Sequence, residues 1–271
     1  MIREPGKALC KLRLLLLCSL VFILSILSAP ARAQGTPVDL ELVLAVDSSS
    51  SVTADEFDLQ MQGIANAFRH SAVTAAIEAA GDLGIAVSLV QWSDNRRQFL
   101  AIDWMHLTDA ESAEAFAEEI DATPRFVIGG GTAIGGAMSF STRLIDRNDY
   151  AGRRKVVDIS GDGRANQGNQ PEAERDKAVA AGFTINGLAI LNEDFLVDRY
   201  YLYNVIGGTG AFLVTAEDFE DFQEAILRKL IQEISGVPLA ALDPALEEKL
   251  AQARGREAGR GETAREGSAG P

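Results

Sequence analysis

The stretch LELVLAVDSSSSV, which runs from Leu40 to Val52, determines how this chain is interpreted. Its first seven residues are almost all apolar and rich in branched side chains, a pattern that predicts a buried β-strand. Asp47 follows at once, and four serines follow Asp47. A buried strand that ends in one carboxylate and four hydroxyls predicts either a helix cap or a ligand site at that end of the strand.

The same alternation of strand and loop continues through the following sequence. Between positions 36 and 236, short branched runs alternate with longer stretches of helical spacing and no linker-like break, which predicts one α/β domain. Several strand candidates are apolar throughout, as expected for strands that helices cover on both faces. The strands are predicted at Leu40–Val46, Ile85–Trp92, Lys155–Ile159, Thr184–Ile190 and Ala211–Val214.

Helical spacing is clearest just after the serines. Apolar side chains recur there at intervals of four, three and four residues, which places them on one face of a helix that packs on the core; they are Phe57, Met61, Ile64 and Phe68. Residues 93–96 are typical of a turn into an edge strand at Gln98–Trp104, so one hairpin is predicted to interrupt the parallel order. Further helices are predicted at Ala110–Ile120, Ala133–Ile145, Glu172–Ala181, Leu196–Val205 and Asp218–Ile234.

The first 33 residues indicate a secretory signal peptide. Basic residues precede the apolar run Leu14–Leu27, and Ala31-Arg32-Ala33 offers a small-residue cleavage site. The alternative is an uncleaved anchor, but a run of about 14 residues is shorter than the roughly 20 that a spanning helix needs. We therefore expect an exported protein, periplasmic or secreted, with no stable membrane insertion after cleavage.

Cleavage also changes the charge and the cysteine content. Cys10 and Cys18, the only cysteines, lie in the segment to be removed, so no disulfide is expected. The whole chain has 25 basic and 39 acidic residues, and residues 1–33 contain five and one of these, which leaves 20 against 38, a net charge of −18. Such a charge repels nucleic acid and anionic lipid and attracts cations.

The composition changes again after position 236. Pro238 and Pro244 flank an Ala/Leu-rich piece, with one short helix predicted over Ala245–Ala253, and Gly, Ala, Arg and Glu dominate from there to Pro271. Residues 237–271 contain too little apolar surface to offset the entropy lost on ordering, so we expect this tail to be disordered.

Three loops of the predicted domain carry small oxygen-bearing side chains. The first is Asp47–Ser51, the second is the glycine-rich run Gly129–Gly135, which contains Thr132, and the third is Ser160–Gly163. In an open α/β sheet, ligands bind beyond the carboxyl ends of the strands, where such loops converge. If these loops meet, they form a cage of oxygen atoms that contains two carboxylates and neither nitrogen nor sulfur. Hard cations such as Mg²⁺, Mn²⁺ or Ca²⁺ suit that set, whereas zinc and copper do not.

These segments resemble a known family. The pattern Asp-x-Ser-x-Ser at positions 47–51, the phrase GGGTAIGGAM at 129–138 and VVDISGDG at 156–163 are similar to the three segments of von Willebrand factor A domains, which carry a metal-ion-dependent adhesion site. VSLVQWS at 87–93 resembles that family's second strand, and the likeness extends over residues 38–235. The whole chain is also similar to a group of exported bacterial proteins of unassigned function.

The resemblance implies a doubly wound, mostly parallel sheet with helices on both faces and one antiparallel edge strand. It implies a divalent cation, with Mg²⁺ expected first and Mn²⁺ or Ca²⁺ as alternatives, completed by an aspartate or glutamate of a protein partner. One departure is Gly161, where the family often has threonine, and glycine is expected to loosen that loop. The implied metal ligands are Asp47, Ser49, Ser51, Thr132 and Asp162.

Each segment also has an ordinary structural interpretation. Serines before a helix are usually N-caps, and this is what we expect of Ser50 and of Thr53, which precedes Glu56. Gly129–Gly131 is also typical of a flexible turn, and Asp162-Gly163 is a common turn dipeptide. The occurrence of all three segments in order favours the metal site.

Enzymatic interpretations are less well supported. Lysine and serine or threonine are missing after Gly135, which excludes a P-loop, and Gly208-Thr209-Gly210 precedes a strand, which disfavours a dinucleotide site. The chain has two histidines, His70 and His106, and no nucleophile elbow. Phosphoryl transfer through Asp47 beside Mg²⁺ is the better enzymatic alternative, although haloacid-dehalogenase-like phosphatases have an aspartate where this chain has Ser49.

A third possibility is a structural or assembly protein whose metal only stabilises its loops.

Aromatic side chains are also expected near the ligand end of the sheet. The candidates are Trp92, Trp104 and above all Phe126, which is the expected rim residue. Of these three functions, the sequence favours an exported, metal-dependent protein-binding module without enzymatic activity.

Overall fold

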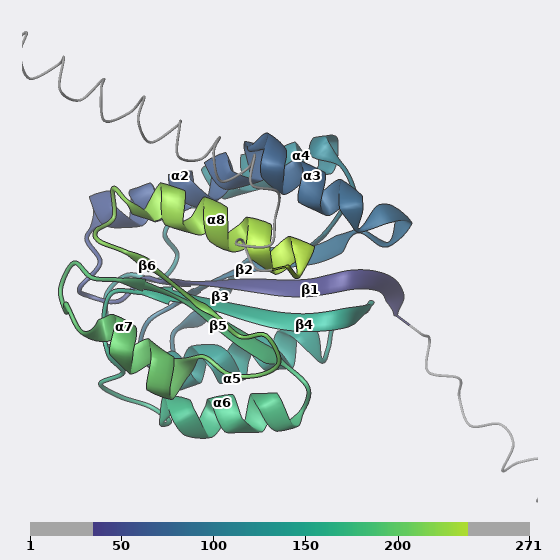
Figure 1. Ribbon diagram of the computed structural model, residues 1–271. Helices are drawn as coiled ribbons and strands as arrows, with labels where there is room; N and C mark the ends of the chain where they lie inside the picture. The colour runs from purple at the N-terminus through teal and green to yellow at the C-terminus, as the bar shows by residue number, and fades with distance from the viewer. Residues whose placement is uncertain (1–34, 238–271) are drawn as a thin grey trace, which may run out of the picture. The chain divides into compact units, whose positions relative to one another are not determined.

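The computed structural model describes residues 35–237, which form a six-stranded sheet between two layers of helices (Figure 1). The strand order is β3-β2-β1-β4-β5-β6. Every neighbouring pair is parallel except β2 and β3, so β3 is an antiparallel edge strand, as the predicted hairpin requires. The strands are β1 (Thr36–Asp47), β2 (Ile85–Trp92), β3 (Gln98–Leu107), β4 (Tyr150–Gly161), β5 (Thr184–Ile190) and β6 (Leu213–Ala216).

The alternation of side chains along β1 builds two cores. Leu42 and Leu44 pack on one face with one set of helices, and Val43 and Ala45 pack on the other face with a second set. Successive side chains of a strand point to opposite faces, so an uninterrupted apolar strand requires cover on both sides. The first layer contains α2 (Ala54–Arg69), α3 (Ser71–Ala79), α4 (Ala110–Ala122) and α8 (Phe222–Ser235), and the second contains α5 (Ile134–Ile145), α6 (Pro171–Ala180) and α7 (Val197–Tyr200) (Figure 1).

Most of the elements predicted from the sequence are present with small shifts at their ends. Ile85–Trp92 and Thr184–Ile190 have the predicted bounds, and the first strand is longer than predicted. Three predictions need correction. The short helix α3 was not foreseen, the last strand starts two residues later than Ala211, and Leu196–Val205 is not one helix. The second half of the segment Leu196–Val205 is instead a π-helical turn, η2 (Tyr201–Val205).

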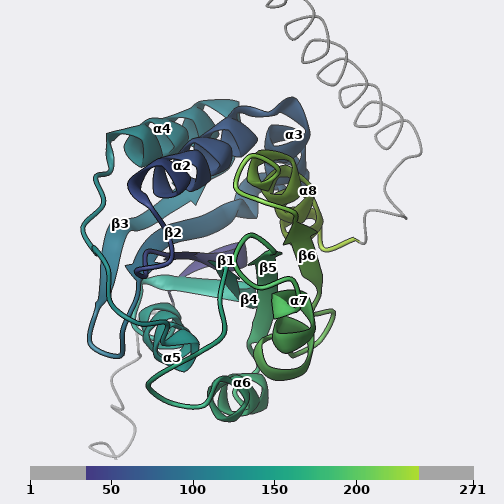
Figure 2. The same cartoon turned by 90° about the vertical axis from the view of Figure 1, so that its left-hand side faces the viewer.

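The carboxyl ends of the parallel strands lie at one edge of the sheet, shown facing the viewer in Figure 2. Asp47 ends β1, is paired in register with Trp92, and lies beside the end of β4, where Val46 is paired with Ser160. β1 and β4 are the two central strands, so the loops after them start side by side. This arrangement brings the first and third oxygen-bearing loops together.

Predictions for the ends of the chain lie outside residues 35–237. They are the signal peptide with Cys10 and Cys18, and the tail with its helix over Ala245–Ala253. Within the described residues, none of the helices has both the length and the apolar character needed to cross a membrane.

Candidate metal centre

The loop from β1 to α2 holds the first three predicted ligands. Asp47 is fully buried, and its Oδ1 accepts a hydrogen bond from the backbone N–H of Ser49 at 2.8 Å. The hydroxyls of Ser49 and Ser51 are 3.1 Å apart, and Ser51 Oγ donates to Oδ1 of Asp162 at 2.9 Å. A chain of hydrogen bonds therefore connects four of the five predicted ligands across two loops.

The helix cap in this loop is Thr53. Its Oγ1 accepts from the N–H of Glu56 at 3.3 Å, while the Glu56 carboxylate accepts from the N–H of Thr53 at 2.8 Å, which confirms the predicted cap of α2. The prediction for Ser50 was wrong. Its Oγ accepts from the N–H of Gly130 at 2.8 Å, and its own N–H donates to the Gly130 carbonyl at 3.0 Å. Ser50 therefore fastens the first loop to the second.

The glycine-rich loop presents Thr132 from the opposite side. Thr132 is buried; its N–H donates to Oδ1 of Asn166 at 2.9 Å and its carbonyl accepts from the N–H of Asn166 at 3.0 Å. A Cβ on Gly131 would lie 1.8 Å from the amide nitrogen of Gln167 and 2.6 Å from Oδ1 of Asn166, so a side chain at this position would displace both groups. The loop after Asp162 thus packs directly on the glycine run. The Thr132 hydroxyl itself makes no hydrogen bond with Asp47 or Asp162 among the described contacts, although it faces Gly163.

Gly161 is explained by what lies next to it. A Cβ on Gly161 would be 2.7 Å from Tyr201 Oη and 2.8 Å from Oδ2 of Asp47. Both distances are shorter than real Cβ contacts allow, so a larger residue here would displace one of these groups. The departure at Gly161 therefore has a physical reason, because Tyr201 occupies the space that a side chain at position 161 would need.

Tyr201 is a residue of the site that the sequence analysis missed. It is fully buried at the start of the π-helical turn η2, and π-helical turns are frequent at functional sites. Burial, with the nearby charges of Asp47 and Asp162, raises the pKa of the Tyr201 phenol well above its usual value. Tyr201 therefore remains a neutral hydroxyl and can donate a hydrogen bond. Its sequence context, an apolar stretch without a motif, offers no signal of this role.

The negative charge of the two buried aspartates, Asp47 and Asp162, is only partly offset by the surrounding protein. Burial, together with the charge of Asp162, raises the pKa of Asp47 from 3.8 to about 7, and burial also raises the pKa of Asp162. The Oδ2 atoms of both aspartates and the Tyr201 hydroxyl are buried without a hydrogen-bond partner. Buried carboxylates without partners are energetically costly, because burial removes water that the protein does not replace.

This donor set fits a hard divalent cation. Asp47, Ser49, Ser51 and Asp162 are joined by hydrogen bonds, Thr132 lies on the adjoining loop, and all five offer oxygen, the ligand atom that Mg²⁺, Mn²⁺ and Ca²⁺ prefer. Within residues 35–237 no group of three or more His, Cys, Asp or Glu side chains is placed to hold a metal, so a site here relies on its hydroxyl ligands.

Arg125 holds the first loop in shape, and no sequence motif indicates this role. Its guanidinium donates to the carbonyls of Val52 at 2.9 Å and Thr53 at 3.0 Å and to the hydroxyl of Ser48 at 2.8 Å. It also lies 5.0 Å from the ring centroid of Phe57. Five donors in a planar fork suit this contact with several carbonyls at once. The serines are therefore positioned by a residue of the loop that precedes the glycine run.

The aromatic candidates separate into two groups. Phe126 is 49% exposed on the loop before the glycines, and its ring lies 4.5 Å from the ring of Phe99. Trp92 is buried beside Asp47 in the register of the sheet. The expectation for Trp104 was wrong, because it lies beside Tyr150, the first residue of β4, at the opposite end of the sheet. The reversed direction of β3 carries it there.

Comparison with known proteins shows the family and the fold of this chain. The model of a family described as a protein of unknown function (DUF1194) matches residues 37–238. No curated protein matches the chain. Among solved structures, proximal thread matrix protein 1 from the mussel byssus is similar at 19% identity and a TM-score of 0.54, over 74% of this chain and 48% of that one. This chain therefore spans about half the length of the mussel protein.

Two further structures extend the comparison. A structure of the mussel protein described with a zinc-occupied MIDAS motif has 18% identity and a TM-score of 0.53, over 73% of this chain and 46% of that one. The vWF domain of the type V pili tip protein Mfa5 from Porphyromonas gingivalis has 13% identity and a TM-score of 0.51, over 73% and 95%. At these identities the likeness is one of fold, and it confirms the von Willebrand factor A architecture.

Proposed function

This chain belongs to the DUF1194 family and has a von Willebrand factor A fold, and we propose that it is an exported adhesion or assembly module that binds a protein partner through a divalent cation. The observation that carries the proposal is the pair of buried, unpartnered Oδ2 atoms on Asp47 and Asp162, at the point where three loops converge. A cation is the partner that both atoms lack.

The residues proposed to hold the ion share one property, an oxygen donor on a loop at the carboxyl edge of the sheet. They are Asp47, Ser49, Ser51, Thr132 and Asp162. Mg²⁺ is proposed first, with Mn²⁺ or Ca²⁺ as alternatives. The ion supplies a strongly electrophilic coordination position, because three of its five proposed ligands are neutral hydroxyls.

Tyr201 is proposed to position Asp47. A Cβ on Gly161 would lie 2.7 Å from the Tyr201 hydroxyl and 2.8 Å from Asp47 Oδ2, neither atom has a hydrogen-bond partner among the described residues, and the hydroxyl stays protonated. A hydroxyl that donates to a carboxylate oxygen fixes the orientation of the carboxylate, and such outer contacts tune metal affinity. Gly161 supports this role, because it leaves the space between the two groups open.

The partner is proposed to contribute an aspartate or glutamate. With a mature charge of −18, the protein repels an acidic partner at long range, and a bound cation reverses the field locally. Beside the site, Phe99, Phe126 and Ile128 expose apolar surface, with exposed fractions of 44%, 49% and 71%. This rim is proposed to contact the partner next to its carboxylate, as aromatic side chains commonly do at the centre of interfaces.

The positions of the histidines support a binding function over a hydrolase. His70 Nδ1 accepts from the N–H of Ala72 at 3.1 Å, where it caps α3, and His106 Nε2 lies 2.7 Å from the carbonyl of Leu83. Neither is placed beside Ser49 or Ser51, so the serines lack a general base there. The likeness to pilus and byssal proteins supports the same interpretation at the level of fold.

Calorimetric titration of the mature chain, beginning at Gln34, tests the metal site. We expect saturable binding of Mg²⁺, Mn²⁺ or Ca²⁺ that Asp47→Ala abolishes and that Asp55→Ala, an exposed aspartate of the same loop–helix unit, leaves unchanged. Zn²⁺ belongs in the same series because of the mussel structure. If folded protein shows no heat with any of these ions, the site is wrong and the cluster is only structural.

The partner and the location need separate experiments. Immobilised protein is expected to capture a partner from extracellular or periplasmic extract with Mg²⁺ and to release it with chelator, and Phe126→Ser is expected to weaken capture without changing metal affinity. Capture that persists in chelator contradicts the cation-mediated contact. Fractionation of expressing cells tests export, and retention of the uncleaved chain in the cytoplasm contradicts it.

A further inference from the structure

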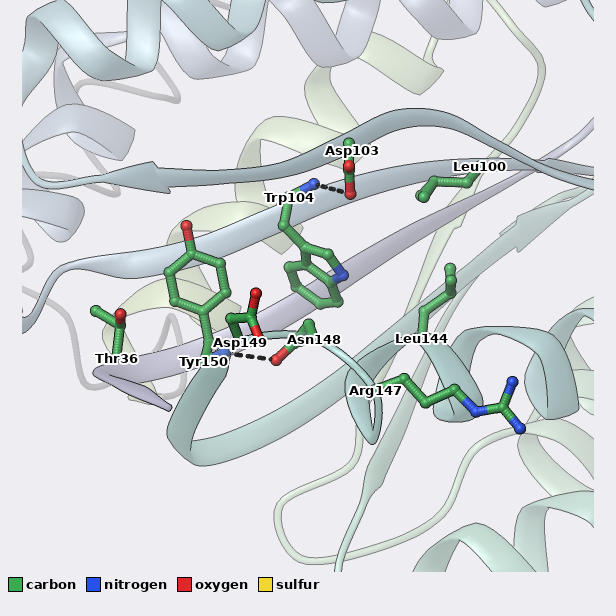
Figure 3. Close-up of a pocket in the computed structure, with 9 residues that line it drawn as sticks. All are labelled: Thr36, Leu100, Asp103, Trp104, Leu144, Arg147, Asn148, Asp149 and Tyr150. Carbon is green, nitrogen blue, oxygen red and sulfur yellow. Dashed lines mark hydrogen bonds between the residues drawn. The ribbon is translucent and has the colours of Figure 1, made fainter. Parts of the chain in front are cut away.

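A hollow lies at the opposite end of the sheet from the proposed metal site. It has a volume of about 470 Å³ and is bounded by β3, by the turn from α5 to β4 and by the start of β1 (Figure 3). Tyr150 at this hollow begins β4, and Gly161 near the metal site ends it. The two sites are therefore separated by the length of the central strand and require separate explanations.

Two aromatic faces form the walls of the hollow. The ring centroids of Trp104 and Tyr150 lie 6.3 Å apart, with their planes inclined by 50°. Figure 3 shows the Trp104 indole between Tyr150 and Leu144. Both aromatic residues are half-buried, so their faces are accessible to a ligand. The negatively polarised face of an aromatic ring attracts cations, and tryptophan does so most strongly.

Two carboxylates add negative charge at the same place. Asp103 and Asp149 both line the hollow together with Trp104 (Figure 3). Within residues 35–237 neither of them forms an ion pair, and Asp103 instead accepts from the N–H of Trp104 at 2.8 Å. Burial, together with the charges of Asp103 and Asp149, raises the pKa of Tyr150. The potential at the aromatic walls is therefore negative.

The neighbouring helix α5 also adds negative potential at the hollow. Leu144 lines the hollow from the last turn of α5, whose carboxyl end carries a partial negative charge. Arg147 also lies at the edge, but Figure 3 shows its guanidinium directed away from the two rings. An apolar floor, two aromatic faces and two carboxylates without cationic partners are the features that recognise an ammonium group bearing carbon substituents.

We propose that this hollow binds an alkylammonium group, which lies against the faces of Trp104 and Tyr150 and is neutralised by Asp149 and Asp103. The carbon substituents of the group contact the rings and Leu144, and its positive charge faces the carboxylates. The site does not depend on the divalent cation, because it lies at the other end of the sheet. A small ligand and a lysine side chain of a partner share this chemistry.

Choline and its uncharged isostere 3,3-dimethyl-1-butanol are the probes that isolate the charge. Ligand-observed NMR with the mature chain in chelator is expected to show choline binding at least five-fold more tightly than the isostere. Equal affinities, or no binding of choline up to tens of millimolar, would overturn the proposal. N-acetyl-lysine methylamide distinguishes the sources: tighter binding of this probe assigns the group to a protein partner, and tighter binding of choline assigns it to a small ligand.

Variants connect the binding to these residues. Asp149→Asn is expected to weaken choline binding at least five-fold, while Asp146→Asn, an exposed aspartate three residues away, leaves it unchanged. Trp104→Leu is expected to abolish binding and Trp104→Phe to retain part of it, which separates loss of the aromatic face from loss of the fold. If Asp149→Asn and Asp146→Asn have the same effect, the charge acts only at long range and the site is wrong.

Discussion

Two clusters of buried carboxylates lie along β4, and they are balanced differently. In the first, Asp158 is 2.7 Å from the ammonium group of Lys229, which also pairs with Glu233, and all three side chains are buried between the sheet and α8. In the second, the Oδ2 atoms of Asp47 and Asp162 have no hydrogen-bond partner among residues 35–237. Asp158 of the first cluster and Asp162 of the second are only four residues apart in sequence.

The two clusters differ in how their buried negative charge is offset. A buried cation that is paired with two carboxylates offsets part of their desolvation, so the Lys229 cluster carries its own counter-charge. The offset is partial, because the pKa of Glu233 still rises to about 7, as that of Asp47 does. In the Asp47 cluster the nearby cation is the half-buried Arg125, and the unpartnered oxygens of this cluster are where we propose that a cation from outside binds.

The largest expected effect is the removal of the internal cation. Lys229→Met leaves Asp158 and Glu233 buried without a counter-charge, and loss of one partner from a buried ion pair typically lowers the free energy of unfolding by about 3 to 5 kcal/mol. Urea unfolding at pH 7, followed by circular dichroism, measures this loss. Lys177→Met, which breaks an exposed pair with Glu174, is expected to change stability by less than about 1 kcal/mol. Equal effects of the two variants would mean that Lys229 does not neutralise a buried cluster.

The second effect is a pH dependence of stability that originates in Glu233. Burial, with the charge of Asp158, raises the pKa of Glu233 from 4.5 to about 7, so the folded chain holds this proton more tightly than the unfolded chain. Stability relative to Glu233→Gln is therefore expected to fall as the pH rises from about 4.5 to 7, by about 3 kcal/mol in total, and to stay level above that. Unfolding of both proteins at several pH values measures the difference. An unchanged difference across this range contradicts the shifted pKa, and Glu118→Gln is the exposed control.

The third effect is a gain in stability at the Asp47 cluster, opposite in sign to the loss expected for Lys229→Met. Asp47→Asn removes a buried charge that hydrogen bonds from Ser49 and the charge of Arg125 offset only in part, so the metal-free variant at pH 8 is expected to be more stable than the natural protein by about 1 to 3 kcal/mol. The variant is also expected to lose any stabilisation by Mg²⁺. Thermal unfolding with Mg²⁺ and with chelator measures both quantities. A variant that is destabilised without metal would show that Asp47 is satisfied within the chain, as Asp158 is.

The smallest effect on stability is expected on removal of the Tyr201 hydroxyl, which lies next to the Asp47 cluster. Tyr201→Phe keeps the ring in the core and removes one buried oxygen without a partner, so stability is expected to change by less than about 1 kcal/mol. Mg²⁺ affinity is expected to fall about tenfold, as commonly follows loss of an outer contact to a metal ligand. Calorimetric titration measures the affinity, and Tyr203→Phe, an exposed tyrosine of the same turn, is the control. Unchanged affinity would limit Tyr201 to packing.

Much of the fold was predictable because strand burial leaves a strong sequence pattern. Leu40–Val46 and Ile85–Trp92 are mostly apolar, and both are strands covered on two faces. The errors occur where tertiary contacts override local patterns. The segment predicted as one helix at 196–205 divides into α7 and a π-helical turn, and η2 places Tyr201 in the core. No local propensity predicts that choice.

The donor set was predictable for a different reason. Asp47 and Asp162 lie at the carboxyl ends of β1 and β4, which meet in any parallel sheet of this order, and short polar side chains stand out there against apolar strands. Thr132 lies in the glycine-rich run just before α5, and that run itself stands out in the sequence. Arg125 and Asn166, which hold the loops in place, were not predictable. Their partners are backbone groups, and a backbone group leaves no signal in the sequence that identifies its partner.

By itself, the sequence determined the α/β class, the antiparallel edge and the set of oxygen donors, because each depends on periodicity or on residue type next to a strand end. Only the tertiary structure decided which carboxylates have a cation. Lys229 is distant from Asp158 in sequence, and α8 brings it to within 2.7 Å. It also decided that Gly161 leaves room for Tyr201 and that Trp104 lies at the other end of the sheet. Charge balance and free space depend on distances between segments, and those distances exist only once the chain has folded.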